Sequence, residues 1–282
     1  MDYKTCWDLQ QELFDAGVAR KRTGPIPVPG ADGADDAGTV LLVEHPPVYT
    51  LGKSGHAENL LVNQEALEAM GAQFFHIDRG GDITFHGPGQ LVCYPILDLE
   101  RIGIGLREYI EALEEAVIRT VAEYGIAAGR IAGASGVWID PGKARPRKIC
   151  AIGVRSSRYV TMHGFALNVT TDLEWFSRIN PCGFTDRGVT SIAAETGSQP
   201  SMQEVKQLVI RELDLPLEQN RLHLSMSVLQ KTYGMTLGPT LVETSLILFR
   251  RCTLHGIIIK FLLILNNRLR ATTSNMLKIM KR

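Results

Sequence analysis

The sequence of 282 residues contains few cysteines and no cysteine pair. Its five cysteines are odd in number and scattered along the chain, with no CxxC spacing; they are Cys6, Cys93, Cys150, Cys182 and Cys252. This pattern excludes a disulfide framework and argues against a structural zinc site. Reduced thiols are typical of a cytoplasmic protein, so we expect a cytoplasmic location and no metal ligands.

Acidic residues are almost absent from the C-terminal part of the chain. Residues 221–282 contain 10 Lys+Arg and one acidic residue, Glu243, whereas residues 1–220 contain 20 Lys+Arg and 29 Asp+Glu. The formal net charge of zero is therefore a sum of −9 and +9. An asymmetry of this size predicts a folded domain over 1–220 and a divergent, poorly ordered basic tail over 221–282. The net charge of the whole chain therefore says nothing about its partners.

Long apolar runs are also missing. The longest, IIIKFLLIL over 257–265, is interrupted by Lys260, whereas a membrane-spanning helix needs about 20 apolar residues. The N-terminal segment MDYKTCWDLQQELFDAG has no central apolar run of the secretory-signal kind. We therefore expect no membrane span; binding of the basic tail to a membrane surface stays an alternative.

Hydrophobic periodicity predicts a mixed arrangement of helices and strands. Apolar residues at three- and four-residue spacing predict helices over 6–20, 63–71, 106–124, 172–179 and 202–213. Short apolar runs predict strands over 39–45, 74–78, 83–86, 90–99, 136–140, 148–157 and 163–169. Residues 22–38, rich in Pro, Gly, Ala and Asp, predict a loop insertion. The expected fold class is α/β (α+β), a mixed β-sheet with flanking helices.

The segment RGGDITFHGPGQ (79–90) has the densest cluster of candidate ligand-binding residues. Four glycines surround Arg79 and His86, and glycines let a backbone approach a ligand closely. The nucleotide fingerprints GxGxxG and GxxxxGK[ST] are both absent from this segment. The pattern fits a cradle for an anionic or elongated ligand, and it fits equally well a pair of tight turns between strands.

Two further clusters carry candidate catalytic groups. In KICAIGVRSSRYVTMHGFALNV (148–169), Lys148 begins a buried strand, where a lysine can serve as a base. His163 in the same cluster is more typical of a hydrogen-bonded structural residue. In NPCGFTDRGVTSI (180–192), Cys182 lies in a rigid Pro-Cys-Gly turn. Cys93 and Cys150 lie in apolar strands and are expected to be inert, so Cys182 is the best candidate nucleophile.

These three clusters, in this order, resemble the octanoyltransferases of lipoate biosynthesis (lipoyl(octanoyl) transferases), within the biotin/lipoate protein ligase-like superfamily. The resemblance covers roughly residues 40–215, and HGPGQLV together with the downstream PCG turn is specific in combination. It implies a biotin/lipoate ligase catalytic-domain-like fold with a substrate tunnel, and makes 1–220 the catalytic domain. It also implies an acyltransferase that moves octanoyl from octanoyl-acyl carrier protein to a lysine. The acceptors are lipoyl domains of 2-oxoacid dehydrogenase complexes and glycine cleavage H protein, with no cofactor and no nucleic acid.

The resemblance also assigns roles to residues. Cys182 matches the acyl-carrying cysteine, and Lys148 matches the lysine that works with it as a dyad. The residues that match segments lining the acyl pocket come from three stretches: Arg79, Gly80, Gly81, Asp82, Ile83, Thr84, Phe85 and His86; Ala151, Ile152 and Gly153; and Gly164, Phe165 and Ala166.

Three alternatives remain open. An ATP-dependent lipoate or biotin ligase would not depend on Cys182. A cysteine acyl-thioester hydrolase would place His86 or His163 beside Cys182 as a base. A non-catalytic module that binds acyl carrier protein would need neither Cys182 nor Lys148. Because carrier proteins are acidic, we also expect a basic docking patch, for which Arg145, Arg147, Arg155 and Arg158 are available.

Overall fold

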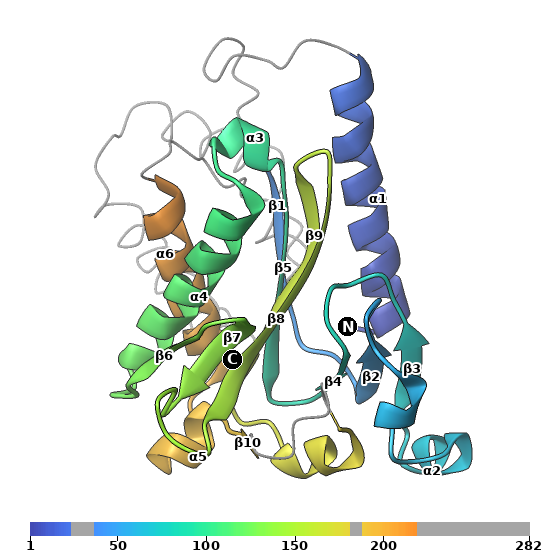
Figure 1. Cartoon of the computed structure of the whole chain (residues 1–282), viewed down its shortest axis with the longest axis vertical. Helices are drawn as coiled ribbons and strands as arrows, with labels where there is room; N and C mark the ends of the chain where they lie inside the picture. The colour runs from blue at the N-terminus through green and yellow to red at the C-terminus, as the bar shows by residue number, and fades with distance from the viewer. Residues whose placement is uncertain (24–36, 181–187, 219–282) are drawn as a thin grey trace, which may run out of the picture. The chain divides into compact units, whose positions relative to one another are not determined.

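The computed structural model describes residues 1–23, 37–180 and 188–218 (Figure 1). The chain divides into two compact units, Met1–Gly234 and Met235–Arg282, and every described residue belongs to the first. The predicted basic tail over 221–282 lies outside the described residues, and its boundary stays a prediction. Of the predicted loop over 22–38, residues 24–36 lie outside the described residues, while its two ends belong to a helix and a strand.

The described strands form two sheets, most of whose neighbours are antiparallel. The larger sheet has the order β1 (Gly38–Val43), β5 (Gln90–Leu97), β9 (Val160–Asn168), β8 (Arg147–Ser157), β7 (Ala134–Ile139) and β6 (Ala128–Ile131), with β10 (Gly188–Val189) parallel to β8. The smaller sheet has the order β3 (Gln73–His76), β2 (Val48–Leu51) and β4 (Ile83–His86), with β2 and β3 parallel.

Helices flank the larger sheet, which confirms the predicted fold class. The α-helices are α1 (Tyr3–Thr23), α2 (Gln64–Ala69), α3 (Leu99–Ile102), α4 (Leu106–Ala122), α5 (Ile192–Thr196) and α6 (Met202–Glu218), and the 3-10 helices are η1 (Ala57–Asn59) and η2 (Leu173–Arg178). The predicted helix over 172–179 is thus a 3-10 helix. The sequence patterns missed β2, β6, β10, α3 and α5, which are too short for a hydrophobic period to show.

The two faces of the larger sheet are covered by different helices (Figure 1). Helices α4 and α6 cover one face and bury a core that includes Leu113, Val117 and Val209 with Leu91 and Leu167 of the sheet. Helix α1 covers the other face, where Phe14 packs with sheet residues such as Tyr94, Met162 and Ala166. Strand alternation therefore gives β5 and β9 one side toward α4 and another toward α1.

Candidate active site

A narrow pocket joins all three predicted binding stretches. Nine of the predicted binding residues line it: Arg79, Thr84, His86, Ala151, Ile152, Gly153, Gly164, Phe165 and Ala166. Four more residues complete the lining, namely Tyr3, Val92, Tyr94 and His163. The pocket volume is about 20 Å³, enough for one water molecule. A larger ligand therefore requires the lining side chains to move apart.

Small residues form the sheet side of this pocket. Ala151 of β8 stands directly opposite Ala166 of β9, and Gly153 stands opposite Gly164. The row continues to β5, where Val92 pairs with Ala166. A Cβ atom at Gly164 would lie 2.2 Å from the Cys93 carbonyl oxygen, so no larger residue fits there. These small residues leave a trough across three strands of the sheet.

The segment that follows Asp78 covers this trough on the β8 side. The Gly80 N–H donates to the Val154 carbonyl at 3.1 Å, and a Cβ at Gly153 would lie 2.7 Å from the Gly80 oxygen. The Arg79 guanidinium donates to the carbonyls of Gly80 and Asp82 at 2.8 and 2.7 Å. Arg79 thereby holds its own loop in shape, and Gly153 allows that loop to approach β8.

Five predicted binding residues lie outside the pocket lining: Gly80, Gly81, Asp82, Ile83 and Phe85. Phe85 is fully buried in the core of the smaller sheet and stacks on Trp175 with ring centroids 5.0 Å apart. Asp82 accepts from the Asn59 side-chain amide at 2.7 Å. On β4, Thr84 and His86 face the pocket while Ile83 and Phe85 face the core, as strand alternation requires. Contact of these five residues with a substrate stays a prediction.

Two buried histidines make one end of the pocket uncharged. The Nδ1–H of His86 donates to Gln90 Oε1 at 2.8 Å, and burial lowers the pKa of His86 to about 3. His45 lies next to it, and its Nε2 accepts from the Tyr94 hydroxyl at 2.9 Å. Burial lowers the pKa of His45 to about 4. At neutral pH both imidazoles are therefore neutral, and their ring nitrogens bond to the Gln90 and Tyr94 side chains and to the Met1 carbonyl.

His163 is held in an unusual backbone conformation. Its φ of 60° lies in the left-handed region, and its N–H donates to Gln10 of α1 at 3.1 Å. The ring Nε2–H donates to Asp78 at 3.1 Å, and Asp78 also forms an ion pair with Arg155. Burial lowers the pKa of His163, while the bond from His163 lowers the pKa of Asp78. The imidazole is thus bound to a carboxylate rather than available as a base for a thiol.

A β-bulge brings Lys148 to the pocket side of the sheet. Val137 pairs with Cys150, but the next residue, Trp138, pairs with Lys148, so Ile149 is an extra residue on β8. Ile149 and Cys150 are adjacent in the chain, yet both lie in the core under α4. Strict alternation would have put Lys148 on that side as well. The extra residue reverses the alternation and places Lys148 on the same face as Ala151 and Gly153.

The side chain of Lys148 crosses a glycine and reaches an aromatic ring. Its ammonium lies 4.5 Å from the Trp138 ring centroid, within cation–π range. A Cβ at Gly136, whose φ is 122°, would lie 3.4 Å from Lys148 Cε, so the glycine leaves room for the lysine stem. The Trp138 Nε1–H donates to the Ala134 carbonyl at 3.0 Å, which fixes the ring.

A chain of buried hydrogen bonds connects the pocket to the strand that carries Lys148. The Gln90 side-chain amide donates to Asn168 Oδ1 at 2.9 Å, and the Asn168 amide donates to the Thr190 carbonyl at 2.9 Å. The Thr190 N–H in turn donates to the Lys148 carbonyl at 3.0 Å. The Gln90 of the HGPGQ stretch is therefore a structural link between His86 and β8, a role that the sequence does not reveal.

Cys182, the predicted nucleophile, lies outside the described residues, and its role stays a prediction. The described residues before 181 and after 187 are anchored by hydrogen bonds. The Asn180 N–H donates to the Asn59 carbonyl at 2.8 Å, and Gly188 pairs with Arg147, the residue before Lys148. Three other cysteines, Cys6, Cys93 and Cys150, are buried, and burial raises the pKa of each thiol.

The expected basic docking patch does not form as one surface. Arg147 is bound by Glu195 through two hydrogen bonds of 3.1 and 3.0 Å and by Asp140 at 2.9 Å. Arg155 pairs with Asp78. Arg145 and Arg158 are exposed, but they flank the two ends of β8, a strand of 11 residues that spans roughly 35 Å. Two of the four arginines are thus neutralised by carboxylates, and the other two are far apart.

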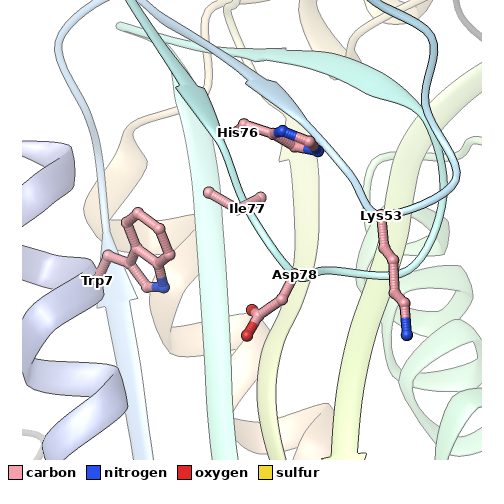
Figure 2. Close-up of a pocket in the computed structure, with 5 residues that line it drawn as sticks. All are labelled: Trp7, Lys53, His76, Ile77 and Asp78. Atoms are coloured by element: carbon pink, nitrogen blue, oxygen red, sulfur yellow. The ribbon is translucent and has the colours of Figure 1, made fainter.

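A second hollow lies beside the pocket, between α1 and the loop after β2. It has a volume of about 510 Å³, is open to solvent and is lined by Trp7, Lys53, His76, Ile77 and Asp78 (Figure 2). Asp78 is shared by the two sites, since it bonds to His163 of the pocket. Within residues 1–23, 37–180 and 188–218, no helix is long and apolar enough to cross a membrane.

Comparison with known proteins identifies the family of catalytic domains to which the chain belongs. Residues 2–214 match the model of the lipoyl protein ligase A/B catalytic domain, and the chain belongs to this family. Two solved structures share the fold. A bi-partite lipoate protein ligase from Thermoplasma acidophilum aligns with a TM-score of 0.54 and 17% identity over 78% of this chain and 83% of its own. A lipoate-protein ligase A bound with ATP aligns with a TM-score of 0.50 and 19% identity over 67% and 76%.

Within this family, the chain is an octanoyltransferase relative. It is 56% identical over 211 residues to the octanoyltransferase of Bacteroides fragilis, covering 75% of this chain and 91% of that protein. It is 54% identical over 219 residues to the octanoyltransferase of Bacteroides thetaiotaomicron, covering 78% and 92%. The octanoyltransferase of Flavobacterium johnsoniae is 51% identical over 216 residues. The predicted family and the acyltransferase class are confirmed.

Proposed function

We propose that this chain transfers an octanoyl group from octanoyl-acyl carrier protein to a lysine of lipoyl domains and glycine cleavage H protein, through a thioester on Cys182. The observation that carries the proposal is the bulge at Ile149, which turns Lys148 onto the face of the trough formed by Ala151 and Ala166. The names of the relatives give the acyl group. The shared fold of a lipoate ligase studied with its E2 lipoyl domain supports the acceptor class.

The first half-reaction forms the enzyme thioester. The Cys182 thiol gives its proton to Lys148, and the thiolate attacks the thioester carbonyl of octanoyl-acyl carrier protein. The carbon–sulfur bond to the carrier breaks, and the carrier thiolate leaves and takes the proton from Lys148, which returns the lysine to its neutral form. One thioester replaces another of similar energy, so the step needs no ATP. The octanoyl chain lies in the trough, where each buried CH₂ contributes about 0.8 kcal/mol.

The second half-reaction forms an amide. The ε-amine of the acceptor lysine attacks the Cys182 thioester, and Lys148 takes the proton that the amine loses. The carbon–sulfur bond breaks and Cys182 leaves as the thiolate. Amide formation from a thioester is downhill, so this step drives the overall transfer. We also place the enzyme in the cytoplasm, where acyl carrier protein and reduced thiols are present.

The hydrolase alternative is less well supported by the geometry. Its base would be His86 or His163, but His86 donates to Gln90 and His163 donates to Asp78. Burial lowers the pKa of both groups, which makes them weak bases. The ligase alternative shares the fold, and the ATP requirement separates it from the transferase.

The test is intact-mass analysis after incubation with octanoyl-acyl carrier protein, without ATP. Wild-type enzyme is expected to gain one octanoyl group, and Cys182→Ala is expected to gain none. Addition of an apo-lipoyl domain should then move the group to the domain. An adduct that survives Cys182→Ala contradicts the assigned nucleophile, and a strict need for ATP favours the ligase.

A further inference from the structure

Tyr3 is the lining residue that helix α1 contributes to the pocket. Its side chain is almost fully buried, with 1% of its surface exposed. The ring stacks on Phe75 at 5.3 Å and on His86 at 6.2 Å, and it meets His45 edge-on at 5.1 Å. Aromatic neighbours on several sides therefore fix the position of this ring.

Tyr3 lies on the side of the pocket that is farthest from the strand of Lys148. The trough starts on β8 at Ala151, crosses β9 at Ala166 and reaches β5 at Val92. The distance from β8 across β9 to β5 is two strand spacings, or roughly 10 Å, which is comparable to the length of an extended eight-carbon chain. Beyond β5 the next strand is β1, and His45, which the Tyr3 ring contacts, follows β1.

The two ends of the lining differ in polarity. Around His163, charged groups form a hydrogen bond and an ion pair through Asp78 and Arg155. Around Tyr3, the imidazoles of His45 and His86 are neutral and hydrogen-bonded, and the Tyr3 ring stacks on the ring of His86. The methyl end of an acyl chain gains free energy in contact with the second surface and not with the first.

We propose that the Tyr3 ring closes the far end of the acyl pocket and sets the length of the acyl chain that the enzyme transfers. The inference rests on the proposed function, because it assumes that the acyl group enters from the Lys148 side. Tyr94 also lies at this end, but its hydroxyl is bound to His45, so its ring cannot retreat without breaking that bond. Tyr3 is therefore a residue that determines specificity and takes no part in the chemistry.

The test is a competition between octanoyl- and decanoyl-acyl carrier protein at equal concentration, read as the masses of the acylated lipoyl domain. Tyr3→Ala opens space beyond the eighth carbon, so the ratio of decanoyl to octanoyl product is expected to rise roughly tenfold over wild type for two additional buried methylenes. Tyr3→Leu should give a smaller rise in the same direction, and it replaces Tyr3→Ala if circular dichroism shows that the alanine variant is unfolded.

Tyr109→Leu is the matched control, because Tyr109 is an equally buried tyrosine of α4, which packs on the opposite face of the sheet. It is expected to keep the wild-type ratio while losing stability. An unchanged ratio in folded, active Tyr3 variants overturns the role of Tyr3 and leaves the proposed function standing. A wild-type enzyme that transfers no acyl group from either donor overturns the proposed function and the role of Tyr3 together.

Discussion

The two faces of the larger sheet are both buried, yet they are built from different side chains. The face under α4 and α6 is dominated by aliphatic residues such as Leu91, Leu167 and Val137. The other face, on the side of α1, has glycines and alanines in register, the rings of Tyr94 and Trp138, and Lys148; the neutral His86 of the smaller sheet lines the pocket with it. The same strands supply both faces, so β5, β8 and β9 each have one side that stabilises the fold and one side adapted to a ligand.

Substitution of Lys148 is the strongest test of the difference between the two faces. Lys148→Ala is expected to reduce octanoyl transfer at least a hundredfold, since a positioned proton acceptor contributes about 10²–10⁴ in rate. The free energy of unfolding should change by less than about 1 kcal/mol. Lys143→Ala is the control, because Lys143 lies in an exposed loop paired with Asp140. Near-normal single-turnover rates for Lys148→Ala would refute its role.

Substitutions on the face covered by α4 are expected to lower stability and to leave the transfer rate unchanged. Leu113 of α4 is buried against this face of the sheet, with 2% of its surface exposed. Leu113→Ala is expected to lower the free energy of unfolding by about 2–5 kcal/mol because it leaves a cavity in an aliphatic core. The transfer rate per folded molecule should remain at the wild-type value. Urea unfolding and an assay at low temperature separate the two quantities, and a large loss of rate in folded enzyme would contradict the division between the faces.

The two neutral histidines beside the pocket, His45 and His86, predict a loss of stability in acid. The pKa of His45 is about 4 and that of His86 about 3 in the folded protein, whereas an unfolded histidine titrates near 6.5. As the pH falls from about 6.5 toward 4, the unfolded chain binds protons that the folded chain does not bind. Each histidine therefore lowers the free energy of unfolding by up to about 1.4 kcal/mol per pH unit.

Urea unfolding between pH 6 and 5 tests this dependence. His86→Gln is expected to reduce the slope by about one proton. Gln73→Ala, at an exposed position of β3 without a titratable group, serves as the control and should keep the wild-type slope. Equal slopes for wild type and His86→Gln would show that His86 is not the neutral group that the pocket requires.

The smallest expected effect is at Trp138. Trp138→Leu removes the ring beside the Lys148 ammonium, a contact worth about 0.5–2 kcal/mol. Transfer is expected to fall severalfold and its pH profile to shift, because the contact acts on the charged form of the lysine. Trp138→Phe keeps an aromatic face and should restore much of the rate and the profile. A pH profile that stays the same in Trp138→Leu would remove Trp138 from the site.

The hydrophobic pattern predicted the fold class, because short apolar runs and glycines mark strands and turns. The three stretches of the pocket came from the resemblance to the octanoyltransferases. The sequence could not predict the bulge at Ile149, since apolar residues on both sides of the extra position look like an ordinary strand. It could not predict Tyr3 either, because an amphipathic helix does not show which ring of its buried face meets a distant pocket. Phe85 was expected to line the pocket, but the pattern of β4 does not reveal which of its sides faces the core.

The segment Arg79–Gly81 has one more consequence, for solubility. Beyond Cys150, no described strand pairs with β8 on the side away from β9, so this part of β8 would offer unpaired backbone groups to other chains. The Gly80 N–H occupies the Val154 carbonyl there and covers part of this edge. Substitutions that displace this loop are therefore expected to promote aggregation through an uncovered strand, even where the catalytic groups are intact.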